Sequence, residues 1–365
     1  MSAGEHDSLI EHSVRRLFAD EVDKGVRERA EAGALDDRLW RLCVDGGLTL
    51  ALASEAAGGS AAGWSAAQPI LHGIGYWQVP LPLAETMVGA LLLSMAGLPM
   101  IVGPIALIEQ GVGNDLQATG TAPAVKLSGT VPHVAWARHA DTAVVALADG
   151  RIALVELRRA RGVSCTERLD VARLPSDTLQ FDDAACSAVA PLATPLPQPV
   201  WTLGALARSL MMVGALESAL EQSVRYAGER VQFGKPIGRN QALQQQLALM
   251  AGDVAAARTA ALAAAADAPD RASAEASAAA FSIAAAKVRC GEAATRACGI
   301  AHQVHGAIGF TREHALHFAT RRLWAWREQF GSDAFWAARL GALAIRGGSQ
   351  HFWPSLTQRR FGAAR

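Results

Sequence analysis

Two segments in the second half of the sequence contain the residue types most able to bind a charged ligand. In the first, Arg225 to Met250, Arg230 and Phe233 lie in a loop rich in glycine and proline, with Gln241 just beyond it. An arginine guanidinium can make two charge-assisted hydrogen bonds to a phosphate group. Each feature is common on its own, because a single arginine of this kind is usually a solvated surface charge and Gln241 is also placed to cap a helix.

The second segment, Gln303 to Arg322, reads QVHGAIGFTREHALHFATRR. Gly306 and Ala307 are small residues of the kind that lets a ligand approach the backbone. His302 and His305 are three residues apart and share one helix face, but no carboxylate or cysteine completes a recognisable ligand set, so we predict no metal site.

The overall composition bounds the class of protein. The chain has 365 residues, of which 51% are hydrophobic, enough for a globular protein of two or three subdomains. Lys+Arg and Asp+Glu both number 34, so no general attraction to nucleic acid or to an anionic membrane is expected. Five widely spaced cysteines form no CxxC pair, and the N-terminus has no apolar signal region. We therefore expect a cytoplasmic protein with free thiols.

One stretch, Met87 to Ile108, is uncharged and long enough to span a bilayer. Gly97, Pro99, Gly103 and Pro104 interrupt it, and a proline inside a helix costs about 3 kcal/mol. We predict a buried helix that runs into a strand, without membrane insertion.

The pattern along the chain changes twice. Residues 1–102 have apolar residues at helical spacing, and residues 196–365 return to that spacing with an alanine-rich stretch that favours close helix packing. Residues 103–195 contain short β-rich runs, which predict a small barrel or sandwich. The predicted fold is α+β, with an N-terminal helical domain, a middle β domain and a C-terminal helical bundle. The expected strands are Val125 to Leu127, Val131 to Trp136, Thr142 to Ala146, Ile152 to Leu157 and Thr178 to Phe181.

The two C-terminal segments resemble acyl-CoA dehydrogenases. The first resembles that family's Arg-x-x-Phe-Gly-x-x-Ile segment with its following Gln, and the second resembles the Gln-x-x-Gly-Gly-x-Gly-Phe-Thr-x-Glu block. A weaker match, LWRLCVDGGLTLALASEAAGG, lies near the N-terminus. The resemblance implies a C-terminal four-helix bundle, a dimer or tetramer, and an FAD-dependent oxidoreductase of fatty acid or lipid metabolism. Such an enzyme desaturates an acyl-CoA thioester and passes electrons to an electron-transfer flavoprotein.

The resemblance also implies that both segments reach across a subunit interface to FAD. By position, Arg230 pairs with the pyrophosphate, Phe233 packs near the cofactor and Gln241 hydrogen-bonds to it, while Ala307 replaces the family's second glycine. The full cofactor-binding set that the resemblance implies is Arg230, Phe233, Gln241, Gln303, Gly306, Ala307 and Ser332.

The match fails at the residue that does the chemistry. Removal of a weakly acidic α-proton needs a positioned carboxylate. At the family's usual base position this chain has Phe330, and at the alternative position, just before Arg208, it has Ala207. The nearest carboxylate in sequence is Glu328, which is more often a solvated loop residue, so the catalytic base is left unassigned.

The middle domain also departs from the family. IEQGVGND, from Ile108 to Asp115, only partly resembles the loop that touches flavin and CoA, and His133 and Ala135 stand where an aromatic residue and a Thr or Ser adjoin the flavin ring. The residues predicted to contact a neighbour's FAD are therefore present, whereas those predicted to contact the chain's own flavin ring are replaced. This combination is expected of one subunit of a heteromer. Three readings stay open: a dehydrogenase, a non-catalytic partner that completes the FAD site of a catalytic homologue, and a flavin monooxygenase on the same fold.

Overall fold

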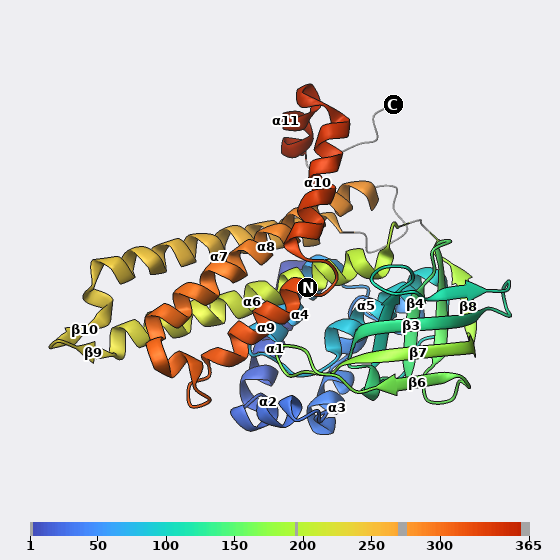
Figure 1. The fold of residues 1–365 in the computed structure, drawn as a ribbon, viewed down its shortest axis with the longest axis horizontal. Helices are drawn as coiled ribbons and strands as arrows, with labels where there is room; N and C mark the ends of the chain where they lie inside the picture. Colours follow the sequence, from blue (N-terminus) through green and yellow to red (C-terminus); the bar gives the residue numbers. More distant parts are fainter. Residues whose placement is uncertain (1–2, 194–195, 269–275, 359–365) are drawn as a thin grey trace.

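The computed structural model describes residues 3–193, 196–268 and 276–358. Its elements follow the predicted order of helices, then strands, then helices (Figure 1). Asp23 and Asp36 begin two of the N-terminal helices, because each carboxylate accepts a hydrogen bond from a backbone N–H three residues on. The N-terminal helices are α1 (Ala3–Glu21), α2 (Lys24–Glu31), α3 (Asp37–Asp45), α4 (Gly63–Tyr76) and α5 (Leu83–Ala96), with short 3₁₀ turns η1 (Leu48–Leu50) and η2 (Glu55–Ala57).

The uncharged stretch forms a buried helix followed by a strand, as predicted. α5 ends at Gly97, whose φ of +63° is the left-handed conformation that favours glycine at a helix end. The strand β1 (Ile105–Glu109) follows, and all five of its residues are buried. Two other helices, α6 (Pro199–Glu229) and α7 (Gln241–Asp267), are long and apolar enough to cross a bilayer by length and composition. The apolar window of α6 is 83% buried within the protein, and that of α7 is 28% buried.

The middle segment consists of two four-stranded sheets, with orders β1-β4-β5-β8 and β2-β3-β7-β6. Residues from both sheets, including Val145, Leu179 and Phe181, form one apolar core. Strands were predicted near β1, β3, β4, β5 and β7, whereas β2, β6 and β8 were missed because each has only three or four residues. The strands after β1 are β2 (Gln117–Thr119), β3 (Lys126–Ala135), β4 (Thr142–Ala146), β5 (Arg151–Glu156), β6 (Val163–Thr166), β7 (Ser176–Ala185) and β8 (Ala188–Pro191), with the turn η3 (Ala137–His139) between β3 and β4.

The C-terminal bundle consists of α6, α7, α8 (Ala276–His305) and α9 (Leu316–Glu328). Alanines on α7 and α8, such as Ala257 and Ala293, are fully buried and allow the close packing that the sequence predicts. α6 also packs tightly on α4, because a β-carbon at Gly214 would come within 2.0 Å of the His72 carbonyl oxygen. The N-terminal helices and the bundle consequently share one apolar core. The division at residues 102/103 and 195/196 remains a proposal.

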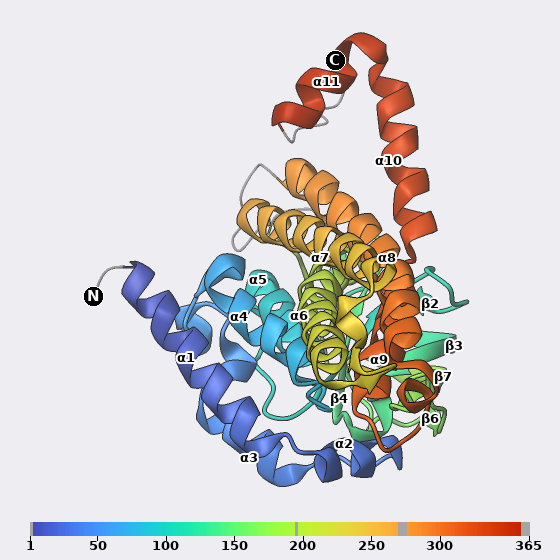
Figure 2. The ribbon, with the colours of Figure 1, turned by 90° about the vertical axis from the view of Figure 1, so that its left-hand side faces the viewer.

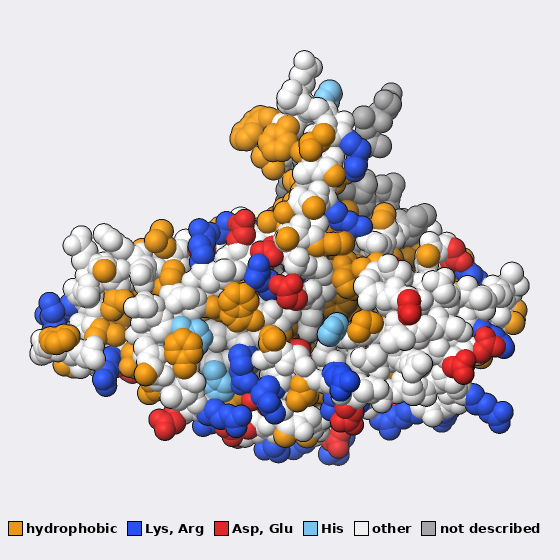
Figure 3. All heavy atoms as spheres, in the orientation of Figure 1, with side chains coloured by type: hydrophobic (Ala, Val, Ile, Leu, Met, Phe, Trp, Pro, Cys, Tyr) orange, Lys and Arg blue, Asp and Glu red, His pale blue; other side chains and the backbone are white. Residues whose placement is uncertain are grey.

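Two last helices, α10 (Asp333–Gly347) and α11 (Ser349–Gln358), extend away from the body of the protein (Figure 2). Hydrophobic side chains gather on this arm (Figure 3), and Ile345 and Trp353 are 83% and 67% exposed. At the opposite end of the bundle, a short hairpin of β9 (Val231–Gln232) and β10 (Lys235–Pro236) with the turn η4 (Ile237–Arg239) joins α6 to α7, and η5 (Gly306–Phe310) joins α8 to α9.

Candidate active-site cavity and cofactor half-site

A cavity of about 720 Å³, here called the central cavity, lies where the β domain meets the bundle. Its walls come from β1 and the following turn, β3, the loop between β6 and β7, and the end of α9 with the residues after it. Much of the wall is apolar, including Leu107, Val131, Val134 and Trp201. A largely apolar cavity with a few polar groups is the usual form of a small-molecule site.

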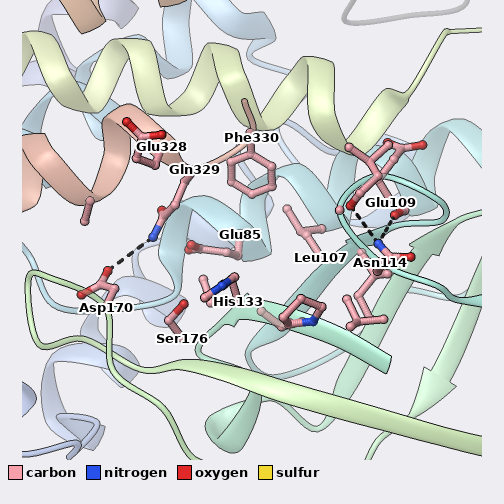
Figure 4. Close-up of a pocket in the computed structure, with 18 of the residues that line it drawn as sticks. Glu85, Leu107, Glu109, Asn114, His133, Asp170, Ser176, Glu328, Gln329 and Phe330 are labelled. Atoms are coloured by element: carbon pink, nitrogen blue, oxygen red, sulfur yellow. Dashed lines mark hydrogen bonds between the residues drawn. The ribbon is translucent and has the colours of Figure 1, made fainter. Parts of the chain in front are cut away.

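Phe330, at the family's usual base position, lines this cavity and points into it (Figure 4). Its ring meets Trp201 edge-on, with centroids 5.7 Å apart, and the Arg208 guanidinium lies 5.2 Å from the ring centre. Its backbone has a φ of +54°, a left-handed conformation that is uncommon for a bulky residue. A phenyl ring cannot accept a proton, so the cavity has no base at this position.

The other two base candidates differ in position. Ala207 is buried in the core of α6 and does not line the central cavity. Glu328 does line it, but its side chain is 64% exposed and lies 3.9 Å from Arg327. Glu328 therefore has the solvated character expected of a loop glutamate.

Three carboxylates around the cavity were not singled out from the sequence: Glu85 and Glu109, which are buried, and Asp170, which is partly buried. Burial raises the pKa of Glu109 to about 7, although its carboxylate accepts a hydrogen bond from the Trp201 backbone N–H at 3.0 Å. Burial also raises the pKa of Asp170 above its ordinary value. Glu109 belongs to the IEQGVGND loop, so its position was available from the sequence, whereas Glu85 and Asp170 had no motif to mark them.

A chain of polar contacts crosses the wall of the cavity. Arg208 forms a buried ion pair with Glu85 and donates from Nε to the Gln329 side-chain oxygen at 2.7 Å. Gln329 in turn donates to Asp170 at 3.4 Å (Figure 4). The side chains of Glu85 and Arg208 are both 3% exposed, so this pair is held out of water.

The residues predicted at the flavin ring, His133 and Ala135, both line the central cavity. His133 is exposed and has a φ of +59°. Four carboxylates in the lining face a single arginine, Arg321, which is itself ion-paired to Glu31. This balance of charge is unfavourable for a phosphate group.

A second hollow, here called the Arg230 hollow, lies at the far end of the bundle and has a volume of about 680 Å³. It is formed by the β9–β10 hairpin and the junction of α8 with η5. Phe233 at the tip of the hairpin is 100% exposed. Gly306 has a φ of +61°, and nothing lies within 4 Å of a β-carbon placed on it, so its backbone is accessible. Of the residues that the sequence assigned to the cofactor, five line this hollow: Arg230, Phe233, Gln303, Gly306 and Ala307.

The donors of the Arg230 hollow suit the diphosphate part of FAD. Its lining contains Arg230 and Lys235 and no acidic residue. Within the described ranges, no carboxylate lies at ion-pair distance from either cation. Two unpaired cations beside an accessible glycine backbone are the groups that a pyrophosphate needs.

The structure does not bring Gln241 or Ser332 into this lining. Gln241 is the first residue of α7 and is exposed, while the preceding Asn240 caps the helix by accepting from the Ala242 N–H at 3.0 Å. The Ser332 hydroxyl oxygen accepts from the Phe335 N–H at 3.2 Å and so caps α10.

His302 and His305 make local contacts. His302 Nε2 lies 3.1 Å from the Thr320 hydroxyl, and His305 Nδ1 lies 2.8 Å from the Ala301 carbonyl oxygen, with its ring stacked on Tyr226. In the part of the chain that the structure describes, no group of three or more His, Cys, Asp or Glu side chains is placed to hold a metal ion.

Comparisons with known proteins agree with this layout. Residues 201–339 match the family model for the acyl-CoA dehydrogenase C-terminal domain. Acyl-CoA dehydrogenase FadE27 of Mycobacterium tuberculosis is 30% identical over 303 residues, covering 77% of this chain and 81% of the relative. Acyl-CoA dehydrogenase IpdE2 of the same organism is 29% identical over 329 residues, covering 88% and 92%.

Two solved structures share the fold along almost the whole chain. A variant of the Tcur3481–Tcur3483 steroid ACAD superposes with a TM-score of 0.83 at 25% identity, covering 95% of this chain and 99% of that one. The ChsE4–ChsE5 complex of Mycobacterium tuberculosis gives a TM-score of 0.81 at 24% identity, covering 94% and 98%. With these matches, and with the helical, β and helical layers predicted from its sequence, the chain belongs to the acyl-CoA dehydrogenase family of oxidoreductases.

Proposed function

We propose that this chain works as one subunit of an FAD-dependent acyl-CoA dehydrogenase, and that it completes the FAD site of a homologous subunit that carries the base. The reaction is α,β-desaturation of an acyl-CoA thioester, with the electrons passed on to an electron-transfer flavoprotein. The assembly is a dimer or tetramer and works in the cytoplasm.

One contrast carries this proposal. The Arg230 hollow keeps two unpaired cations and an exposed Phe233, while the two base positions are occupied by Phe330 and Ala207. The two linings share no residue, so the hollow and the central cavity are separate half-sites on this chain.

In this assignment the residues of the chain bind and orient the cofactor. Arg230 and Lys235 would neutralise the pyrophosphate, and Phe233 would contact the dinucleotide. FAD, when bound, accepts the hydride that leaves the β-carbon. The α-proton goes to a carboxylate of the homologous subunit, since neither Phe330 nor Ala207 can accept it.

The described relatives support a two-chain arrangement. One similar structure is named as a complex of two proteins, ChsE4 and ChsE5, and another joins two proteins, Tcur3481 and Tcur3483, in a steroid ACAD. A bulky, ring-containing acyl group is therefore worth including in any substrate panel, beside straight-chain thioesters.

The test is to purify the chain alone and together with a homologous partner, and to record flavin absorbance before and after adding acyl-CoA thioesters. We expect stoichiometric FAD and bleaching of its absorbance only in the two-chain assembly. Full FAD content and turnover by the chain alone would refute the divided site. Oxygen consumption by the chain above that of reduced flavin alone, with an oxygen atom transferred to an organic substrate, would instead support the monooxygenase hypothesis.

A further inference from the structure

Lys287 on α8 is fully buried, which is unusual for a lysine. Its ammonium donates to two backbone carbonyl oxygens, those of Arg327 and Gly331, each at 2.7 Å. Among the described residues no carboxylate lies within ion-pair distance of it. Burial lowers the pKa of Lys287 to about 7. An ammonium in this environment is costly, so its retention needs a reason.

The two carbonyls flank the segment that lines the central cavity. Between Arg327 and Gly331 lie Glu328, Gln329 and Phe330, and all three line the cavity. Arg327 also belongs to the last turn of α9, where backbone carbonyls lack helical partners and the helix dipole favours a positive charge. Lys287 thus connects the last turn of α9, at Arg327, to Gly331 at the other end of this wall segment.

This wall segment has a conformation that needs support. Phe330 and Gly331 have φ angles of +54° and +90°. A bulky residue is strained in the left-handed region, so the surrounding structure must hold it there. The Phe330 carbonyl oxygen accepts from the Trp336 indole N–H at 2.9 Å, which adds a second restraint.

We propose that Lys287 is a positioning residue that holds the segment Glu328–Phe330 in place, and so sets the depth of the central cavity through the Phe330 ring. That the central cavity of this chain can bind an acyl chain extends the function proposed above, in which the base lies in the homologous subunit. The role of Lys287 rests only on the contacts of this chain.

Lys287→Met separates this role from simple packing. Methionine has a similar length and no charge, so if Lys287 only filled space the variant would be as stable as the parent or more stable. The variant leaves the Arg327 and Gly331 carbonyls without this donor, and if Lys287 positions the segment, the segment loosens. We then expect amide hydrogen exchange in a peptide covering residues 328–332 to accelerate at least tenfold, with exchange in the β domain unchanged. Lys126→Met, at an exposed lysine, is the control.

Trp336→Phe provides a second route, because it removes the other restraint without leaving a buried charge. It should accelerate exchange in the same peptide, and the two substitutions should be non-additive if both hold one conformation. If Lys287→Met does not fold, Lys287→Gln, which keeps an uncharged N–H donor group, replaces it in this comparison. Unchanged exchange in residues 328–332 for the folded variants would overturn the proposal.

The depth of the pocket is tested on the purified full chain without its homologous partner, by isothermal titration with butanoyl-CoA, octanoyl-CoA and free CoA, so that no other subunit's cavity contributes. Lys287→Met should change the ratio of the two thioester dissociation constants at least threefold and leave the free CoA value unchanged. An unchanged ratio would overturn the role in depth. If the parent binds neither thioester, the assignment of the acyl pocket fails, while the exchange experiment still decides the role of Lys287.

Discussion

The ring of Phe330 packs directly on Gly204 of α6, where a β-carbon would come within 2.5 Å of two ring carbons. Gly204→Ala must therefore displace the ring or shift the helix. Overpacking of this kind costs about 1–3 kcal/mol. We expect the free energy of unfolding, measured by urea denaturation, to fall by that amount.

Gly252→Ala is the matched control, because Gly252 is also inside a helix and nothing lies within 4 Å of its added β-carbon. That variant should be stabilised by up to about 1 kcal/mol through helix propensity alone. Adding Phe330→Ala to Gly204→Ala should recover part of the loss. Equal stability of the Gly204→Ala and Gly252→Ala variants would show that the contact is not tight.

The ion pair of Glu85 and Arg208 leads to a second prediction. Both side chains are 3% exposed, so Glu85→Leu leaves a guanidinium buried without its partner. Such a change typically costs 3–5 kcal/mol, whereas replacing both members by apolar residues is often nearly neutral. We expect a large loss of stability for Glu85→Leu and a much smaller one for Glu85→Leu combined with Arg208→Met, measured by thermal and urea unfolding.

The sequence predicted well what depends on local pattern. The helical and β segments follow from periodicity. Arg230 and Phe233, which the sequence predicts to bind the cofactor, lie in one continuous motif and line one hollow. Phe330, which the sequence put at the family's usual base position by counting from a nearby motif, lines the central cavity.

Contacts between segments that are distant in the chain could not be predicted from the sequence. Glu85 and Arg208 are 123 residues apart, and nothing local marks them as partners. The buried state of Lys287 likewise depends on α8 packing against the end of α9, because a lysine in a helix is usually exposed. Gln241 shows the opposite case: a motif position that the structure leaves on the surface while its neighbour Asn240 lines the hollow.

Glu109 should make stability depend on pH. Its pKa in the folded protein is about 7, above the ordinary value of 4.5. Between these pH values the folded chain keeps a proton that the unfolded chain has released, so the free energy of unfolding falls as pH rises, by up to about 1.4 kcal/mol per pH unit for this group. Glu109→Gln removes this contribution.

The measurement is the difference in unfolding free energy between Glu109→Gln and the parent from pH 4 to 8. The unfolding free energy of the variant relative to that of the parent should rise between about pH 4.5 and 7 and stay constant above pH 7. A difference that does not change with pH would mean that Glu109 ionises normally in the folded protein.

The last prediction concerns the cofactor half-site. Arg230→Gln keeps a polar side chain but removes its charge from the hollow. The FAD affinity of the assembled protein should therefore fall at least tenfold, because one charge-assisted contact of roughly 1.5–3 kcal/mol is lost.

Arg239→Gln is the control, because Arg239 lies in the same connection between α6 and α7, is exposed and does not line the hollow. Retained FAD is measured by absorbance after dialysis, and circular dichroism checks the fold. Since Arg230 is exposed, both variants should unfold at the parent temperature when FAD is absent. Equal loss of FAD in the two variants would point to general surface charge, and no loss in either would remove Arg230 from the cofactor site.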